Sequence, residues 1–150
     1  MLEESEIFLT AEDLTPWGLE LTQDEPDKLM KVWTCTERNS LIQKVVDIRW
    51  IFDTSEEAHQ YHVDHLEENA EGSSELSAIN EPFGQDLYVF FKDPNDPMLA
   101  MFNLEMNMFY FIFREKNVLA KVFISGSSGL TLDDATQIAR AADGWIKGKF

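Results

Sequence analysis

The last third of the chain carries the pattern that most constrains its fold. Two apolar runs, 108–113 and 118–124, are joined by Lys116 and Asn117, a pair suited to a tight hairpin turn because Asn tolerates a positive φ angle. A Gly/Ser-rich turn then leads to Thr131, a helix-capping residue, and to a segment with the periodicity of an amphipathic helix. A β-hairpin closed by a packing helix predicts an α+β protein.

The remaining segments predict further strands and one more long helix. Thr54 and Glu57 have the spacing of a capping box, which opens a helix running to about Gly72. Residues 23–28 and 73–85 are predicted to be acidic or polar loops. The predicted fold is a mostly antiparallel sheet of five to seven strands with two principal helices packed on it, α-β-α sandwich-like, in a single domain, 1–150. The strand candidates are 19–22, 32–37, 42–52, 87–91 and the stretch from Met98 to the hairpin.

Alternation along two elements predicts which side chains are buried. In the strand at 42–52, Gln43, Asp47 and Arg49 occupy the polar face of a half-buried strand. The opposite, apolar face holds Ile42, Val46, Ile48, Trp50 and Phe52. The buried stripe of the last helix is predicted to be Leu132, Ala135, Ile138, Ala139, Ala142, Trp145 and Ile146.

The charge of the chain is strongly negative and unevenly placed. The formal net charge is −16, from 28 acidic and 12 basic residues. Residues 1–30 hold nine acids and one base, and residues 53–97 hold twelve acids and one base. Such a surface repels nucleic acid and anionic membranes and attracts cationic partners, so we expect a basic protein as partner and neither nucleic acid nor membrane.

Cysteine content and the N-terminus indicate the compartment. Cys35 is the only cysteine, so no disulfide can form within the chain, and a reducing compartment fits best. Residues 1–6 have neither a basic nor an apolar region of a signal peptide, and the longest apolar run is too short to span a bilayer. We therefore expect a cytoplasmic protein.

The acidic residues are the leading candidates for a binding surface. On the first long helix, acidic residues gather on the face opposite the apolar one, which predicts either a solvated surface or a docking surface for a basic protein. The favoured function is a non-enzymatic acidic protein-binding domain, in particular an immunity-type inhibitor of a basic partner. The expected contacts are Asp24, Glu25, Asp27, Glu57, Asp64, Glu68 and Glu71.

The aromatic residues of the last third allow three interpretations. Phe109, Phe111 and Phe113 pack under the C-terminal helix, or form a partner or homodimer surface, or line a small apolar ligand pocket. The last interpretation belongs to the alternative function, a sensor-like or carrier domain that binds a small apolar ligand between sheet and helix. Its pocket would be lined by Trp50, Tyr110 and Trp145.

Three histidines are the best candidates for chemistry, at His59, His62 and His65 of the first long helix. Their spacing of three lets two imidazoles share a metal but turns the third away, so core or surface histidines are favoured over a metal site. A metal-dependent enzyme using His59 and His62 is the third hypothesis. The Gly/Ser turn at 125–129 lacks a P-loop lysine, and no nucleophile elbow is present, so no catalytic residue and no cofactor is predicted.

A set of apolar positions and turns recurs from one end of the chain to the other. It consists of Phe8 to Leu14 closed by Gly18, Trp50 to Asp53 before a helix, Phe113-Arg114, Asn117-Val118, Ala120, Val122, Leu130-Thr131, Asp134-Ala135 and Ile138-Ala139. This set resembles bacterial lipoprotein and sensor-type extracellular domains, loosely of the PsbP/Mog1-like α-β-α sandwich kind. The resemblance implies a non-enzymatic domain that binds partners or ligands. This chain, however, shows no export signal and lacks the cysteine pairs that many such exported domains carry.

Overall fold

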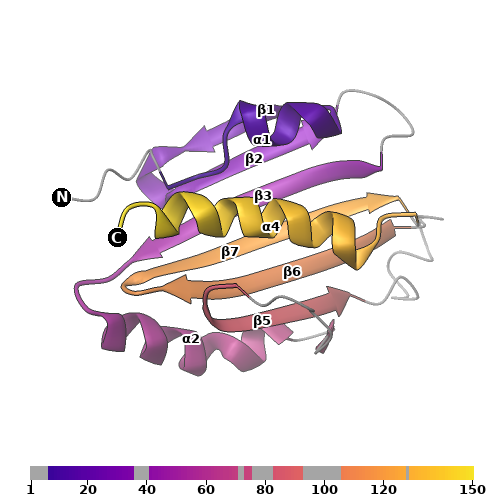
Figure 1. The fold of residues 1–150 in the computed structure, drawn as a ribbon. Coiled ribbons are helices and arrows are strands. Elements are labelled where there is room, and N and C mark those ends of the chain that lie inside the picture. Colours follow the sequence, from indigo (N-terminus) through magenta and orange to yellow (C-terminus); the bar gives the residue numbers. More distant parts are fainter. Residues whose placement is uncertain (1–6, 36–40, 71–72, 76–82, 93–105, 128) are drawn as a thin grey trace.

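A computed structural model describes residues 7–35, 41–70, 73–75, 83–92, 106–127 and 129–150. Its seven strands form one antiparallel sheet in the order β1-β2-β3-β7-β6-β5-β4 (Figure 1). The strands are β1 (Leu19–Glu25), β2 (Met30–Cys35), β3 (Ile42–Ile51), β4 (Ser73–Glu75), β5 (Gln85–Lys92), β6 (Met106–Glu115) and β7 (Val118–Ser127). The helices are α1 (Ala11–Leu14), α2 (Ser55–Ala70) and α4 (Leu132–Lys147), with 3₁₀ turns η2 (Thr15–Trp17) and η3 (Pro26–Lys28).

The helices cover both faces of the sheet. In Figure 1, α4 crosses the front of the sheet with α1 beside it. Successive residues of β6 point to opposite faces, so Phe111 joins the core under α4 while Ile112 joins a smaller cluster that includes Tyr61 and Leu66 of α2. The α+β class and the α-β-α layering predicted from the sequence are confirmed.

Both long helices begin where their capping residues predict. The Thr54 hydroxyl accepts a hydrogen bond from the Glu57 amide at 3.1 Å, one turn into α2. The Thr131 hydroxyl accepts from the Asp134 amide at 3.2 Å and donates to the Asp134 carboxylate at 2.8 Å, which completes the cap of α4. These side chains pair amides that the first turn leaves without helical partners.

Two predicted loops contain strand. Residues 23–25, predicted as loop, continue β1, and Ser73–Glu75 form the edge strand β4. In both places the neighbouring strand supplies backbone hydrogen-bond partners, which local polarity does not reveal. The part of the predicted strand that covers 98–105, and Gly72 at the predicted end of the first long helix, lie outside the described residues.

The predicted apolar face of β3 is wrong at Ile42, because the strand contains a bulge beside this residue. The pairing of β3 with β7 shifts between Ile42 and Lys44, so the residues before and after this point change faces. Ile42 therefore lies in the core under α4, whereas Trp50 packs on the α2 side. Asp47 and Arg49, predicted on the polar face, are 0% and 1% exposed.

The buried stripe of α4 is confirmed except at one end. Ala135, Ile138, Ala139, Ala142 and Ile146 are buried, but the Trp145 residue is 38% exposed. The indole Nε1 of Trp145 donates to the Asp13 carboxylate at 2.7 Å, which ties α4 to α1. The buried arc extends instead to Asp143, which is only 4% exposed.

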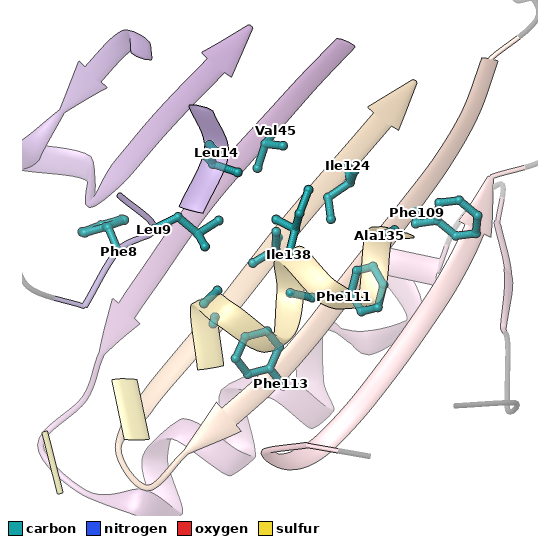
Figure 2. Packing of buried hydrophobic residues seen from close by; sticks show 14 of the residues in the cluster. Phe8, Leu9, Leu14, Val45, Phe109, Phe111, Phe113, Ile124, Ala135 and Ile138 are labelled. Atoms are coloured by element: carbon teal, nitrogen blue, oxygen red, sulfur yellow. The ribbon is translucent and has the colours of Figure 1, made fainter. Parts of the chain in front are cut away.

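The phenylalanines of β6 form the core layer beneath α4. Phe109, Phe111 and Phe113 are buried and face Ala135 and Ile138 of the helix (Figure 2). Packing under the C-terminal helix, the first of the three interpretations, is therefore confirmed. These three side chains are 4% exposed or less. The homodimer predicted through the same strand stays a prediction.

Gly126 allows the end of β7 to lie very close to the start of β3. A Cβ atom at this position would lie 2.1 Å from the Leu41 carbonyl oxygen and 3.1 Å from the Cα of Ile42. We expect Gly126→Ala to lower the free energy of unfolding by about 2 kcal/mol, because backbone atoms must move to admit the methyl group. Urea denaturation would measure the loss, with Gly144→Ala as control, since a Cβ at Gly144 meets nothing within 4 Å. Equal stability of the two variants would contradict this prediction.

Candidate functional site

Helix α2 presents an exposed acidic surface. Its first turn packs through Ala58, and its exposed surface carries four carboxylates, which we call the α2 acidic face: Glu56, Glu57, Asp64 and Glu68. Within the described residues, no base forms an ion pair with these carboxylates. Gln60 donates a hydrogen bond to Asp64 at 2.8 Å, and Val63, at the margin of the same face, is 50% exposed.

The predicted contact residues do not all lie on one surface. Asp24 and Asp27 are exposed and Glu25 is half-buried, but they belong to β1 and η3 at the far edge of the sheet. Two strands, β2 and β3, separate this edge from β7, the strand that α2 contacts (Figure 1). The structure therefore groups the acids of α2 and leaves those of β1 apart, while Glu71 lies outside the described residues.

One flank of α2 holds a polar network centred on Asp86. The Asp86 carboxylate contacts His59 Nδ1 at 2.7 Å and accepts from Arg114 Nε at 2.9 Å, beside a shallow depression that also includes Ser55 and Glu56. Burial favours the protonated acid, but the hydrogen bonds from His59 and Arg114 outweigh it and lower the pKa of Asp86. The network ties the start of α2 to β5 and β6.

The three histidines face different partners. His62 is 1% exposed, and its Nε2 donates to the Asp86 carbonyl at 2.9 Å, as expected of a core histidine. His65 Nδ1 donates to the Tyr61 carbonyl at 2.8 Å, whereas His59 turns to the Asp86 carboxylate. Among the described residues, no group of three His, Cys, Asp or Glu side chains is arranged to hold a metal ion.

The other flank of α2 covers a small cavity of about 120 Å³ against the sheet. Three ionisable side chains at or near this cavity are partly or fully buried. Burial lowers the pKa of His62 and of Lys121, and raises the pKa of the neighbouring Tyr110. The walls are formed by Trp50, Tyr61, His62, His65, Glu68, Ile112, Leu119 and Lys121.

The structure separates the residues of the predicted ligand pocket. Trp50 and Tyr110 lie on the α2 side of the sheet, where Trp50 lines the cavity and Lys121 stands 5.3 Å from the centre of the Tyr110 ring. Trp145 belongs to α4 on the opposite face. The two tryptophans lie apart because Trp50 belongs to the face of the sheet that α2 covers, whereas α4 packs on the other face.

Two buried polar clusters escaped the sequence analysis. Asp47 and Arg49 form a buried ion pair on the α4 side of the sheet. Asp143 of α4 lies near Glu115, and burial together with the hydrogen bond and negative charge of Glu115 raises the pKa of Asp143 to about 7. The helical spacing of Asp143 from Ala139 and Ile146 was a usable signal. The burial of the pair in β3 depends on the segment 7–9 that covers it, and this contact is not visible in the local sequence.

Comparison with known proteins gives a likeness of fold. No protein-family model matches the chain, and no curated protein matches it either. The extracellular domain of PknH from Mycobacterium tuberculosis is similar in structure, with a TM-score of 0.51 at 10% sequence identity, over 97% of this chain and 76% of that one. None of the described helices is both long and apolar enough to cross a bilayer.

Proposed function

We propose that this chain is a non-enzymatic domain that binds a basic protein through the α2 acidic face. The observation that carries the proposal is the grouping of four exposed carboxylates that no described base pairs with, next to the half-exposed Val63. Charge complementarity raises association rates and selects partners, and an apolar side chain at its margin adds desolvated contact area. The remaining acids of the chain strengthen the attraction at long range.

The finer form of the proposal is an immunity-type inhibitor that covers a cationic surface of its partner. The α-β-α layering agrees with the resemblance to PsbP/Mog1-like sandwiches, which implies binding rather than catalysis. A cytoplasmic location belongs to the same proposal, since the lone Cys35 suits a reducing compartment.

A sensor-like or carrier role is the second candidate function. The cavity between α2 and the sheet favours it, because aromatic, apolar and charged side chains converge there on a space large enough for a small molecule.

Reversing the charge of the α2 acidic face should abolish partner binding. We expect the triple variant Glu57→Lys, Asp64→Lys, Glu68→Lys to lose the basic protein that the wild-type chain retains from a lysate of its source organism at low salt. We also expect wild-type affinity for that protein to fall by at least about tenfold on raising the salt from about 50 to 300 mM, because exposed charges are screened. Isothermal titration of the recovered protein measures both effects.

The matched control carries the same change of charge at the far edge of the sheet. Glu20, Asp24 and Asp27 are exposed residues of β1 and η3, and their replacement by lysine should leave most of the affinity intact. If both triple variants lose affinity equally, net charge alone governs binding and the α2 acidic face is not the docking surface. Affinity that is insensitive to salt would also refute the proposal.

A further inference from the structure

The C-terminal end of α4 has a polar contact on each side. In Figure 1 this end lies on the same side of the molecule as the tight turn between β6 and β7. On the exposed side, Trp145 donates to the Asp13 carboxylate of α1. On the buried side, Asp143 hydrogen-bonds to Glu115 at the end of β6. Asp143 and Glu115, which we call the carboxyl pair, therefore attach the end of the helix to the hairpin from below.

The carboxyl pair needs a proton. A carboxylate only accepts hydrogen bonds, so two carboxyl groups can bond to each other only while one of them is protonated. The Oδ1 atom of Asp143 is also buried, and none of the described residues donates to it. A Cβ atom at Gly84 would lie 3.3 Å from this oxygen and 3.2 Å from the Cβ of Phe113, so its surroundings are backbone and an aromatic side chain. Loss of the proton would place two carboxylates against each other, one of them with an anionic oxygen that lacks a donor.

The bases near the pair do not replace the proton. Arg49 of β3 and Lys147 of α4 favour the ionised form of Asp143, but burial and the contact with Glu115 outweigh them and raise the pKa of Asp143 to about 7. The Arg49 guanidinium is already paired with Asp47. Lys147 is exposed, so water screens its charge.

The helix is locally weak directly after Asp143. Gly144 is an exposed residue inside α4, and a Cβ atom there would meet nothing within 4 Å, so packing does not require a glycine. Glycine inside a helix favours the open backbone, because it loses more conformational freedom on folding than other residues. The N-terminal half of α4 is anchored separately, by Ala135 and Ile138 over the phenylalanines of β6 (Figure 2). The end of the helix can therefore open without its start.

We propose that the carboxyl pair holds the last turns of α4, residues 143–147, on the β6–β7 hairpin in a pH-dependent manner, and that loss of its proton detaches these turns while the sheet stays folded. The attached state binds the proton more tightly than the detached state, so attachment weakens as the pH rises from about 4 through about 7. The inference concerns the face of the sheet opposite α2, and it is independent of binding through the α2 acidic face.

Amide hydrogen exchange tests the proposal on the wild-type chain. Each rate is divided by the intrinsic rate of the same amide at that pH, which gives a protection factor. We expect the protection of residues 143–147 to fall by about tenfold per pH unit between about pH 5 and 7, and to level off above about pH 8. At about pH 7.5, the paired residues of β3 and β7 should stay at least about tenfold better protected, because the sheet remains folded.

Two variants identify the group that titrates. In Asp143→Asn and in Glu115→Gln, the new amide can donate to the remaining carboxylate without a titrating proton, so the fall in protection should be reduced by about tenfold or more. Asp133→Asn, which changes an exposed acid of the same helix, should keep the wild-type fall. Equal pH dependence in the wild type and both pair variants would overturn the role of the carboxyl pair. Equal protection of residues 143–147 and of β3 and β7 at every pH would overturn local detachment, since the helix would then open only with the whole fold.

Discussion

Replacing Arg49 by methionine is expected to lower the free energy of unfolding by about 3–5 kcal/mol. The guanidinium pairs with the Asp47 carboxylate, and its Nε donates to the Ile7 carbonyl at 3.0 Å. The Asp47 carboxylate also accepts from the Leu9 amide at 2.8 Å. Without Arg49, this carboxyl group is left in the core without its counter-charge, and residues 7–9 lose one of their attachments to β3.

The measurement is urea denaturation at neutral pH, with Lys44→Met as the matched control. Lys44 is an exposed base on the same strand, so its replacement makes the same change of charge without uncovering a buried partner. Loss of stability in Arg49→Met that does not exceed the loss in Lys44→Met would show that the pair contributes nothing. Burial raises the pKa of Asp47 while Arg49 opposes the rise, so the carboxyl of Arg49→Met should take up a proton more readily.

Replacing Asp143 by asparagine is expected to raise stability at neutral and alkaline pH. The pKa of Asp143 is about 7 in the folded protein, above its ordinary value of 3.8, because of burial and of the hydrogen bond and charge of Glu115. The folded state therefore binds the proton more tightly than the unfolded state, and the free energy of unfolding falls as the pH rises from about 4 through 7. Asparagine can keep a hydrogen bond to Glu115 without carrying charge, so this decline disappears.

Between pH 4 and 8, the free energy of unfolding of the wild type should fall by on the order of a few kcal/mol more than that of Asp143→Asn. Chemical denaturation of the wild type and of Asp143→Asn across this range gives it directly, since the other carboxyl groups titrate in both proteins. Asp133→Asn is the control, because Asp133 is an exposed acid in the first turn of the same helix. If the free energy of unfolding changes with pH in the same way in the wild type and in Asp143→Asn, Asp143 does not have the raised pKa.

Much of the architecture could be predicted from local patterns. The hairpin of β6 and β7, the caps at Thr54 and Thr131 and the burial of Phe111 each depend on residues close in sequence, where turn chemistry and periodicity are informative. Edge strand β4 could not be predicted in this way, because the hydrogen bonds that define it come from β5.

The candidate site was less accessible to sequence reasoning. The acids of α2 were grouped correctly because helical periodicity alone places them on one side. Those of β1 were added to them because sequence does not reveal that two strands separate β1 from β7. Trp50 and Trp145 were assigned to one pocket for a similar reason, since the sequence does not reveal that α2 and α4 cover opposite faces of the sheet.

The pairing of β3 with β7 also bears on how the chain acquires its structure during synthesis. This central strand pair joins residues 42–51 to residues 118–126, which are far apart in the sequence. The two strands can pair only when the long chain segment between them is closed into a loop. Closing such a loop costs entropy before any contact is gained, and it slows folding relative to proteins with local contacts. Until the ribosome has released the last third of the chain, β1, β2 and β3 have an open strand edge and lack the cover of α4. The nascent N-terminal half therefore remains vulnerable to association with other chains until the last third has emerged.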